Sequence, residues 1–195
     1  MASSATRPGV ADVMAFAANL KSSEMATQIA AARNLAEVLN ECDMVEGTQM
    51  GQALRDHGVI GDLASLLGKE SDELSSLALY CLANLCCDSV DNASAASKHQ
   101  LFACNMGPVI VQALNSKSTN VISYASGLCL NLSSESDWNT ALVDFGCLQQ
   151  LEQLISHEDQ QIVFQSKSLL VNMLRDHLPP LGTTEESVAS QVRSI

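Results

Sequence analysis

The chain has 195 residues, of which 47% are apolar and only 4% aromatic, so it can bury a core built largely from leucine and alanine. This composition favours an all-α fold. Acidic residues outnumber basic ones by 22 to 10, which gives a net charge of −12. Nucleic-acid binding is not expected, because it needs basic side chains that neutralise phosphates. An acidic surface keeps a protein in solution, and it also suits a basic protein partner.

The cysteines lie mostly in apolar segments and form no C-x-x-C motif. We therefore expect reduced thiols and a cytoplasmic location, with the nucleus as the alternative. Cys86, Cys87, His99 and Cys104 do not have the spacing of a zinc module, so neither a metal nor another cofactor is expected. No apolar run reaches the length of about 18 residues that a membrane span needs.

The N-terminal part predicts two helices. Residues 10–21 and residues 24–40 carry apolar side chains at three- and four-residue spacing, which places them on one face. We expect a loop at residues 43–47 and then a short helix through residues 50–54 that stops at Gly58. Glycine accepts the left-handed conformation that often follows a helix end.

Three further segments follow one plan. Each begins at a glycine and contains a short helix, a polar turn and a long helix that bears an asparagine at a nearly constant distance from the glycine. The glycines are Gly58, Gly107 and Gly146, and the asparagines are Asn84, Asn131 and Asn172. The predicted short helices cover residues 59–67, 108–114 and 147–155, and the long helices cover residues 72–86, 119–133 and 160–175. Ser71, Ser118 and Asp159 are expected to cap the long helices.

Two motifs recur in register in these segments. Each short helix carries apolar residues in the same phase after its glycine, and each long helix carries its asparagine within an apolar stretch. In the first segment they read Leu-x-x-Leu-Leu at residues 63–67 and Ala-x-x-x-Leu-x-Asn-Leu at residues 78–85. The matching residues are 58–67 with 78–85, 107–114 with 128–132, and 146–151 with 169–174. This arrangement resembles the armadillo repeat family over about residues 24–177. The resemblance implies an all-α fold, a right-handed α-solenoid of three-helix repeats.

The resemblance also implies a domain organisation. Residues 1–23 form an N-terminal helix or cap, residues 24–177 the repeat domain, and residues 178–195 a tail or cap with a helical turn near 187–192. Repeat units are expected at about 24–57, 58–106, 107–145 and 146–177. The stretch 87–100 is longer than the family spacing, so it either lengthens the first helix of the next unit or forms a projecting loop, which is a tolerated insertion or a contact site.

The groove residues follow from the resemblance, in which asparagines of the third helices bind the backbone of an extended peptide. Tyr80 lies one turn before Asn84 and Tyr124 two turns before Asn131, so each shares a face with its asparagine. The candidate partner-binding residues are Tyr80, Asn84, Tyr124, Asn131, Ser168 and Asn172. The alternative is that the asparagines hold the repeats together. Tyr80, Gly127 and Ser168 stand where nuclear-import receptors have tryptophan, so that type of recognition is not expected.

No catalytic motif is present, so we expect a protein that is not an enzyme. Gly68-Lys69-Glu70 lacks the upstream glycine of a phosphate loop, and His157-Glu158 lacks the second histidine of a zinc protease. The favoured function is a protein-interaction module or scaffold that binds a partner segment in its groove or joins a larger complex. A regulator of a small GTPase and a cytoskeletal or ciliary structural subunit are the alternatives.

Overall fold

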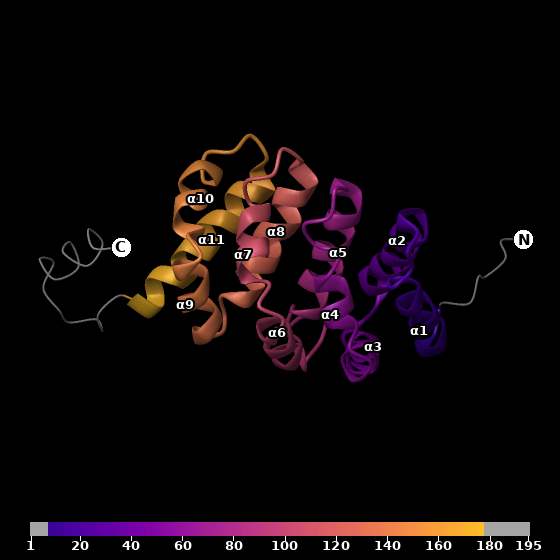
Figure 1. The fold of residues 1–195 in the computed structure, drawn as a ribbon. Helices are drawn as coiled ribbons and strands as arrows, with labels where there is room; N and C mark the ends of the chain where they lie inside the picture. Colours follow the sequence, from indigo (N-terminus) through magenta and orange to yellow (C-terminus); the bar gives the residue numbers. More distant parts are fainter. Residues whose placement is uncertain (1–7, 178–195) are drawn as a thin grey trace, which may run out of the picture.

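The computed structural model describes residues 8–177, which form eleven α-helices and no strand (Figure 1). The expected all-α fold is confirmed. The helices are α1 Val10–Asn19, α2 Met25–Glu41, α3 Met44–Asp56, α4 Val59–Ala64, α5 Asp72–Leu85, α6 Ser94–Ala103, α7 Gly107–Ala113, α8 Thr119–Leu132, α9 Ser136–Asp144, α10 Cys147–Leu154 and α11 Gln160–His177. The tail 178–195, with its expected turn near 187–192, lies outside the described residues.

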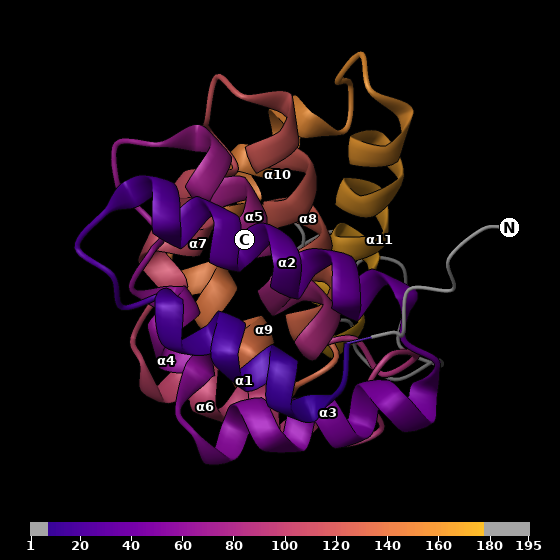
Figure 2. The same ribbon diagram turned by 90° about the vertical axis from the view of Figure 1, so that its right-hand side faces the viewer.

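The helices form a stack in which the long helices are neighbours. α2, α5, α8 and α11 pack side by side in this order, from the indigo end to the yellow end of Figure 1. The short helices α1, α4, α7 and α10 each pack on the long helix that follows, and α3, α6 and α9 complete the three-helix pattern. Figure 2 looks along the stack from the end that carries α1 and α2. The structure is thus an α-solenoid, as expected.

The core runs through the middle of the stack and consists of the apolar residues that carry the repeated motifs. Leu63, Leu82 and Leu128 are fully buried, as are Ala78 and Ala125 on the long helices. Small side chains such as these alanines let packed helices approach closely, and leucines fill the space between helices. The stack is continuous, so the boundary between two repeat units is a matter of convention. The predicted unit boundaries at residues 58, 107 and 146 remain a prediction.

Polar caps define the starts of the long helices. The Ser71 hydroxyl accepts a hydrogen bond of 3.2 Å from the backbone N–H of Leu74. The Asp159 carboxylate accepts from the backbone N–H groups of Gln161 and Ile162 at 2.8 and 3.3 Å. Ser118 occupies the cap position of α8 without a side-chain cap bond. Two of the three expected caps therefore form.

The repeated glycines turn the chain at two of the three positions, including the expected turn at Gly58. Gly58 and Gly146 have φ values of 73° and 82°, in the left-handed region that glycine accepts without strain. Gly107 is different, because it is the first residue of α7, and Asn105 makes the left-handed turn at φ 55°. A Cβ atom at position 107 would lie 2.2 Å from the Phe145 ring. Gly107 thus allows close packing instead of turning the chain.

The expected loop at residues 43–47 is wrong, because α3 begins at Met44. The Asp43 carboxylate accepts from the backbone N–H groups of Val45 and Glu46 at 2.8 and 2.9 Å. Glu46 accepts from the N–H of Asp43 in return, which completes a capping box. Gly47 suggests a loop by its type, yet it lies inside the helix, where a Cβ atom would meet the Val90 carbonyl oxygen at 2.2 Å.

The longer connection at 87–100 does not lengthen the next helix. α6 has 10 residues and the corresponding α9 has 9, so the additional residues lie in the loop between α5 and α6. This loop packs onto α3 instead of projecting. The fully buried Asp91 forms an ion pair with the buried Arg55, and the Asn92 N–H donates to the Thr48 hydroxyl at 3.2 Å. The loop is therefore held against the preceding repeat.

Candidate functional site

The candidate site is a groove across the long helices α5, α8 and α11, here called the amide groove. Four of the predicted residues line it: Tyr80 and Asn84 from α5, and Tyr124 and Asn131 from α8. The other lining residues are Ala83, Cys87, Ser123, Gly127, Leu130, Gln161 and Gln165. The helical spacing that predicted a shared face therefore brings both tyrosines and two asparagines into one hollow. Ser168 and Asn172 do not line it.

The two tyrosines contact each other at the edge of the groove. Their ring centroids are 5.0 Å apart at an interplanar angle of 70°, which is an edge-to-face pair. The Tyr80 hydroxyl donates a hydrogen bond of 2.7 Å to the Asn40 side-chain oxygen on α2. Burial raises the pKa of Tyr80, so its hydroxyl stays protonated and available as a donor. The pair is thus fixed by contacts with three successive long helices.

A second hollow lies on the other side of the tyrosine pair, between α2 and α5. It is lined by Arg33, Ala36, Glu37, Asn40 and Leu77, together with both tyrosines. Tyr80 and Tyr124 therefore form a common wall between the two hollows. Arg33 pairs with Glu73, and both side chains are about half exposed. This second hollow, here called the α2–α5 hollow, thus differs from the amide groove in having charged residues.

The asparagine side-chain nitrogens are used within the fold. Asn131 Nδ2 donates to the Ala83 carbonyl oxygen at 2.8 Å, and Asn172 Nδ2 donates to the Ser133 hydroxyl at 2.9 Å, so both link neighbouring long helices. Asn84 Nδ2 donates to the Tyr80 carbonyl oxygen of its own helix at 3.0 Å. The alternative prediction, that asparagines hold repeats together, thus describes Asn131 and Asn172. A partner-binding role for the six candidates remains a prediction.

The side-chain oxygens of Asn84 and Asn131 have no hydrogen-bond partner among residues 8–177. Both oxygens belong to half-buried residues that line the amide groove. Gln165 adds a third such acceptor, because its Oε1 is buried and has no partner within the same range. A carboxamide whose nitrogen is held in place presents its oxygen in one orientation. The groove therefore offers oriented acceptors.

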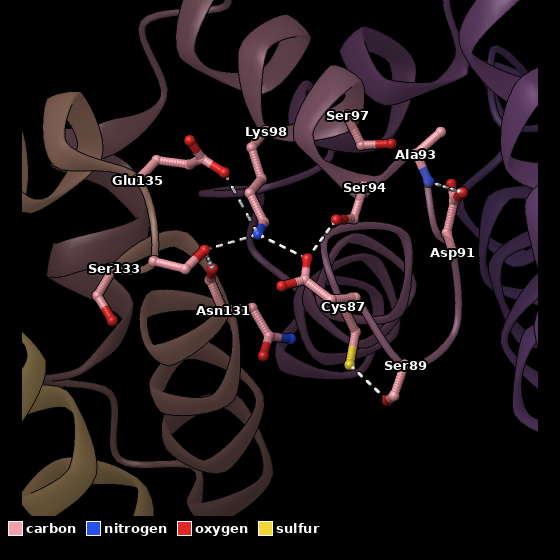
Figure 3. A network of polar contacts seen from close by, with 12 residues as sticks. Cys87, Ser89, Asp91, Ala93, Ser94, Ser97, Lys98, Asn131, Ser133 and Glu135 are labelled. Carbon is pink, nitrogen blue, oxygen red and sulfur yellow. Dashed lines mark hydrogen bonds and ion pairs between the residues drawn. The ribbon is translucent and has the colours of Figure 1, made fainter.

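A polar network that the sequence did not reveal adjoins one end of the groove (Figure 3). The Lys98 side chain is only 2% exposed, and its Nζ donates to Asp88 Oδ1 at 2.9 Å and to the Ser134 hydroxyl at 2.7 Å. Glu135 lies 3.8 Å from the same nitrogen. The Ser134 hydroxyl in turn donates to the Asn131 carbonyl oxygen at 3.0 Å. The network thus connects the α5–α6 loop to the end of α8.

One oxygen of the Asp88 carboxylate, Oδ1, accepts from both Ser94 and Lys98. A hydrogen bond from Ser94, followed by the bond and charge of Lys98, lowers the pKa of Asp88. Trp138 of α9 also contacts this network, because its indole N–H donates to the Lys98 carbonyl oxygen at 3.0 Å. The signal in the sequence was a single lysine in an otherwise small and polar stretch. Asp88 lies in that stretch, but Ser134 and Glu135 follow α8.

The buried thiols of Cys81 and Cys86 are not activated nucleophiles. Burial raises the pKa of Cys81 and of Cys86 to about 12, so both remain protonated at neutral pH and are poor nucleophiles. Within the described range, no group of His, Cys, Asp and Glu side chains is arranged to hold a metal ion. In that range, too, every helix is too short or too polar to cross a membrane.

Solved structures of designed armadillo repeat proteins match this fold. One of them, in complex with the peptide (KR)4, is 19% identical with a TM-score of 0.69, and the match covers 86% of this chain and 70% of that one. A second, computationally designed for modular peptide recognition, is 16% identical with a TM-score of 0.71 and coverages of 94% and 80%. This chain spans 63% and 38% of two further engineered proteins, at TM-scores of 0.70 and 0.72 and identities of 20% and 23%.

No family model and no curated protein matches the sequence. The likeness is therefore one of backbone structure, at sequence identities below 25%. It establishes the fold of this chain, but it does not show that this chain binds the partners of the designed proteins. The long helices that line the groove correspond to the asparagine-bearing helices from which the resemblance was first inferred. The chain has the armadillo repeat fold.

Proposed function

We propose that the protein binds an extended segment of a partner protein along the face formed by α2, α5, α8 and α11. The observation that carries this proposal is the convergence of Tyr80, Tyr124, Asn84 and Asn131 in one groove. Two designed proteins of the same fold support it, because one was made for modular peptide recognition and the other was solved with a peptide.

The chemistry of the groove suits a peptide backbone. An extended segment has N–H groups that need acceptors when it leaves water, and the oxygens of Asn84 and Asn131 supply them. Tyr80 and Tyr124 add flat amphipathic surface with few rotatable bonds, which limits the entropy lost on binding. Because both asparagine nitrogens are already bonded within the fold, the acceptors need little reorganisation when a partner arrives.

The protein acts in this proposal as a cytoplasmic interaction module or scaffold without catalysis. The protonated, buried thiols of Cys81 and Cys86 support this view, because neither is an activated nucleophile. The dispersed negative charge adds long-range attraction for a basic partner. Attraction over the whole surface does not itself decide which residues enter the groove.

Co-purification followed by mass spectrometry tests the proposal. The groove variant is the double substitution Tyr80→Ala and Tyr124→Ala, and the matched control is Val45→Ala, at a side chain that is 67% exposed on α3. We expect partners of the wild type to be lost by the groove variant and kept by the control, with both variants folded by circular dichroism. A groove variant that keeps every partner would refute the proposal.

A further inference from the structure

The amide groove contains no charged side chain, although the whole chain carries a net charge of −12. Its polar lining consists of amides and hydroxyls, and its remaining surface is small or apolar. Acidic residues outside the groove account for the net charge, for example Glu37 in the α2–α5 hollow. The local chemistry of the groove therefore does not follow from the overall charge.

Two carboxylates that adjoin one end of the groove both lie beside Lys98. Asp88 follows the lining residue Cys87 and bonds to Lys98 and Ser94, and Glu135 also lies beside Lys98. A cationic side chain in the groove would have to share these acids with the ammonium group of Lys98. It would lose hydration in the groove without gaining a carboxylate there.

The groove offers oriented acceptors, and Ser123, Tyr124, Gln161 and Gln165 add neutral groups that can also donate. The oxygens of Asn84, Asn131 and Gln165 lack partners within residues 8–177, while the nitrogens of Asn84 and Asn131 are used by backbone carbonyls. A carboxylate ligand would meet no cationic side chain in the groove, so the loss of its hydration would not be offset there. Neutral N–H and O–H groups match the lining without the desolvation of a charge.

The α2–α5 hollow beyond the tyrosine pair is different, because it contains Glu37. This exposed carboxylate has no ion-pair partner in the described part of the chain, whereas Arg33 beside it is paired with Glu73. An extended segment that crosses the long helices reaches Glu37 only after passing Tyr80 and Tyr124. One basic side chain at that end would meet a carboxylate that is free to pair.

We propose that the amide groove selects an uncharged stretch of extended chain rich in amide and hydroxyl side chains, with a single basic residue placed over Glu37. The inference rests on the proposed function and specifies its ligand. Long helices packed about 8–10 Å apart and a rise of about 3.3 Å per residue give an uncharged stretch of about five or six residues across α5, α8 and α11.

Selection from a library of random short peptides displayed on phage tests this inference. Peptides are selected on the wild-type protein and counter-selected on the Tyr80→Ala/Tyr124→Ala variant, which keeps the surface charge and so removes peptides that bind by charge alone. We expect the groove-dependent peptides to be depleted of Lys, Arg, Asp and Glu over the uncharged stretch. Their affinity should change less than about threefold when the salt concentration is raised about tenfold.

Two substitutions change the charge of the site in opposite ways. Glu37→Gln should remove the preference for the single basic residue and weaken a selected peptide by about two- to fivefold. Gln165→Glu places a carboxylate in the groove, so the same selection should then enrich Lys and Arg within the stretch. These shifts are not expected from a change in folding alone.

The possible results are distinct. Groove-dependent peptides that are basic along their whole length would overturn this inference and leave the proposed function intact. A selection in which no peptide depends on Tyr80 and Tyr124 would overturn both. An unchanged preference in Gln165→Glu would contradict the idea that the neutral lining sets the choice of ligand.

Discussion

Asp91 carries its carboxylate in a position with no exposure to solvent. It forms an ion pair with Arg55, and it also accepts a hydrogen bond of 2.8 Å from the backbone N–H of Ala93. Arg55 donates in addition to the Ser97 hydroxyl at 2.9 Å. These contacts join α3 to the α5–α6 loop and to α6. The ion pair therefore stabilises the packing of two successive repeats against each other.

Asp91→Ala should lower the free energy of unfolding by about 3–5 kcal/mol, because it leaves the buried Arg55 without its counter-charge. Urea denaturation at neutral pH measures the loss. The matched control is Asp62→Ala, which removes an acid from a pair with Lys21 whose lysine side chain is 64% exposed. That change should reduce stability by less than about 1 kcal/mol. Equal losses in the two variants would contradict the assigned role of Asp91.

Asp88 predicts a dependence of stability on acid pH. Its pKa is lowered from 3.8 in the folded protein by Ser94 and Lys98, and the unfolded chain lacks these contacts. The unfolded state therefore binds the proton more readily, and the stabilisation is complete above the ordinary pKa and is lost as the pH falls through the folded value. The difference in unfolding free energy between wild type and Asp88→Asn should shrink below about pH 3.8.

Urea denaturation of both proteins over a series of pH values measures this difference, provided that each point is taken where both remain folded without denaturant. The carboxamide that the Asp88→Asn substitution introduces cannot titrate, so the variant serves as the reference. A difference that stays constant from neutral pH to the acid limit would show that Asp88 does not contribute through its charge.

At the scale of the element, the effect of replacing a glycine inside a helix depends on the atoms that a Cβ atom would meet. A Cβ atom at Gly47 of α3 would lie 2.2 Å from the Val90 carbonyl oxygen, a backbone atom that cannot rotate away. A Cβ atom at Gly61 of α4 would meet only the Cys104 sulfur at 3.8 Å, which is ordinary contact. The same substitution is therefore expected to have opposite signs at the two positions.

Gly47→Ala should destabilise the protein by about 1–3 kcal/mol through overpacking, in spite of the better helix propensity of alanine. Gly61→Ala should stabilise it by about 0.5–1 kcal/mol, because alanine loses less backbone entropy in a helix. Thermal unfolding followed by circular dichroism compares them. A stabilised Gly47→Ala protein would mean that the α5–α6 loop does not pack on α3 as described.

Local chemistry explains which elements the sequence predicts well. The long helices were predicted to within about two residues because polar caps such as Ser71 and Asp159 precede strongly periodic apolar residues. The start of α3 was missed because Gly47 suggested a loop, although Asp43 and Glu46 form a capping box. The reason for that glycine is the contact with Val90, which lies in another repeat.

The site was predictable only in part for the same reason. Helical spacing placed Tyr80 with Asn84 and Tyr124 with Asn131, and stacking of α5 on α8 then brought the pairs together. Helical spacing within one segment cannot show that Lys98 meets Ser134, because this contact joins side chains from different repeats. Nor could it show which atoms of the asparagines are used within the fold.

At the scale of the whole molecule, the hydrogen bonds that link neighbouring long helices also fix the residues that line the amide groove. Tyr80 contacts α2 through Asn40, and Asn131 contacts α5 through the Ala83 carbonyl. Each repeat mainly contacts its neighbours, so the relative position of the long helices depends on such links. A partner that crosses several long helices would therefore bind a surface whose spacing is already set.

The central claim is that the partner segment lies across the long helices, and nuclear magnetic resonance of the labelled protein tests it most directly. The ligand is the peptide most enriched on the wild-type protein without counter-selection. We predict that the side-chain amide signals of Asn84, Asn131 and Gln165 and the ring signals of both tyrosines shift on titration. Shifts confined to α3, α6 and α9, with the groove signals unchanged, would contradict the account.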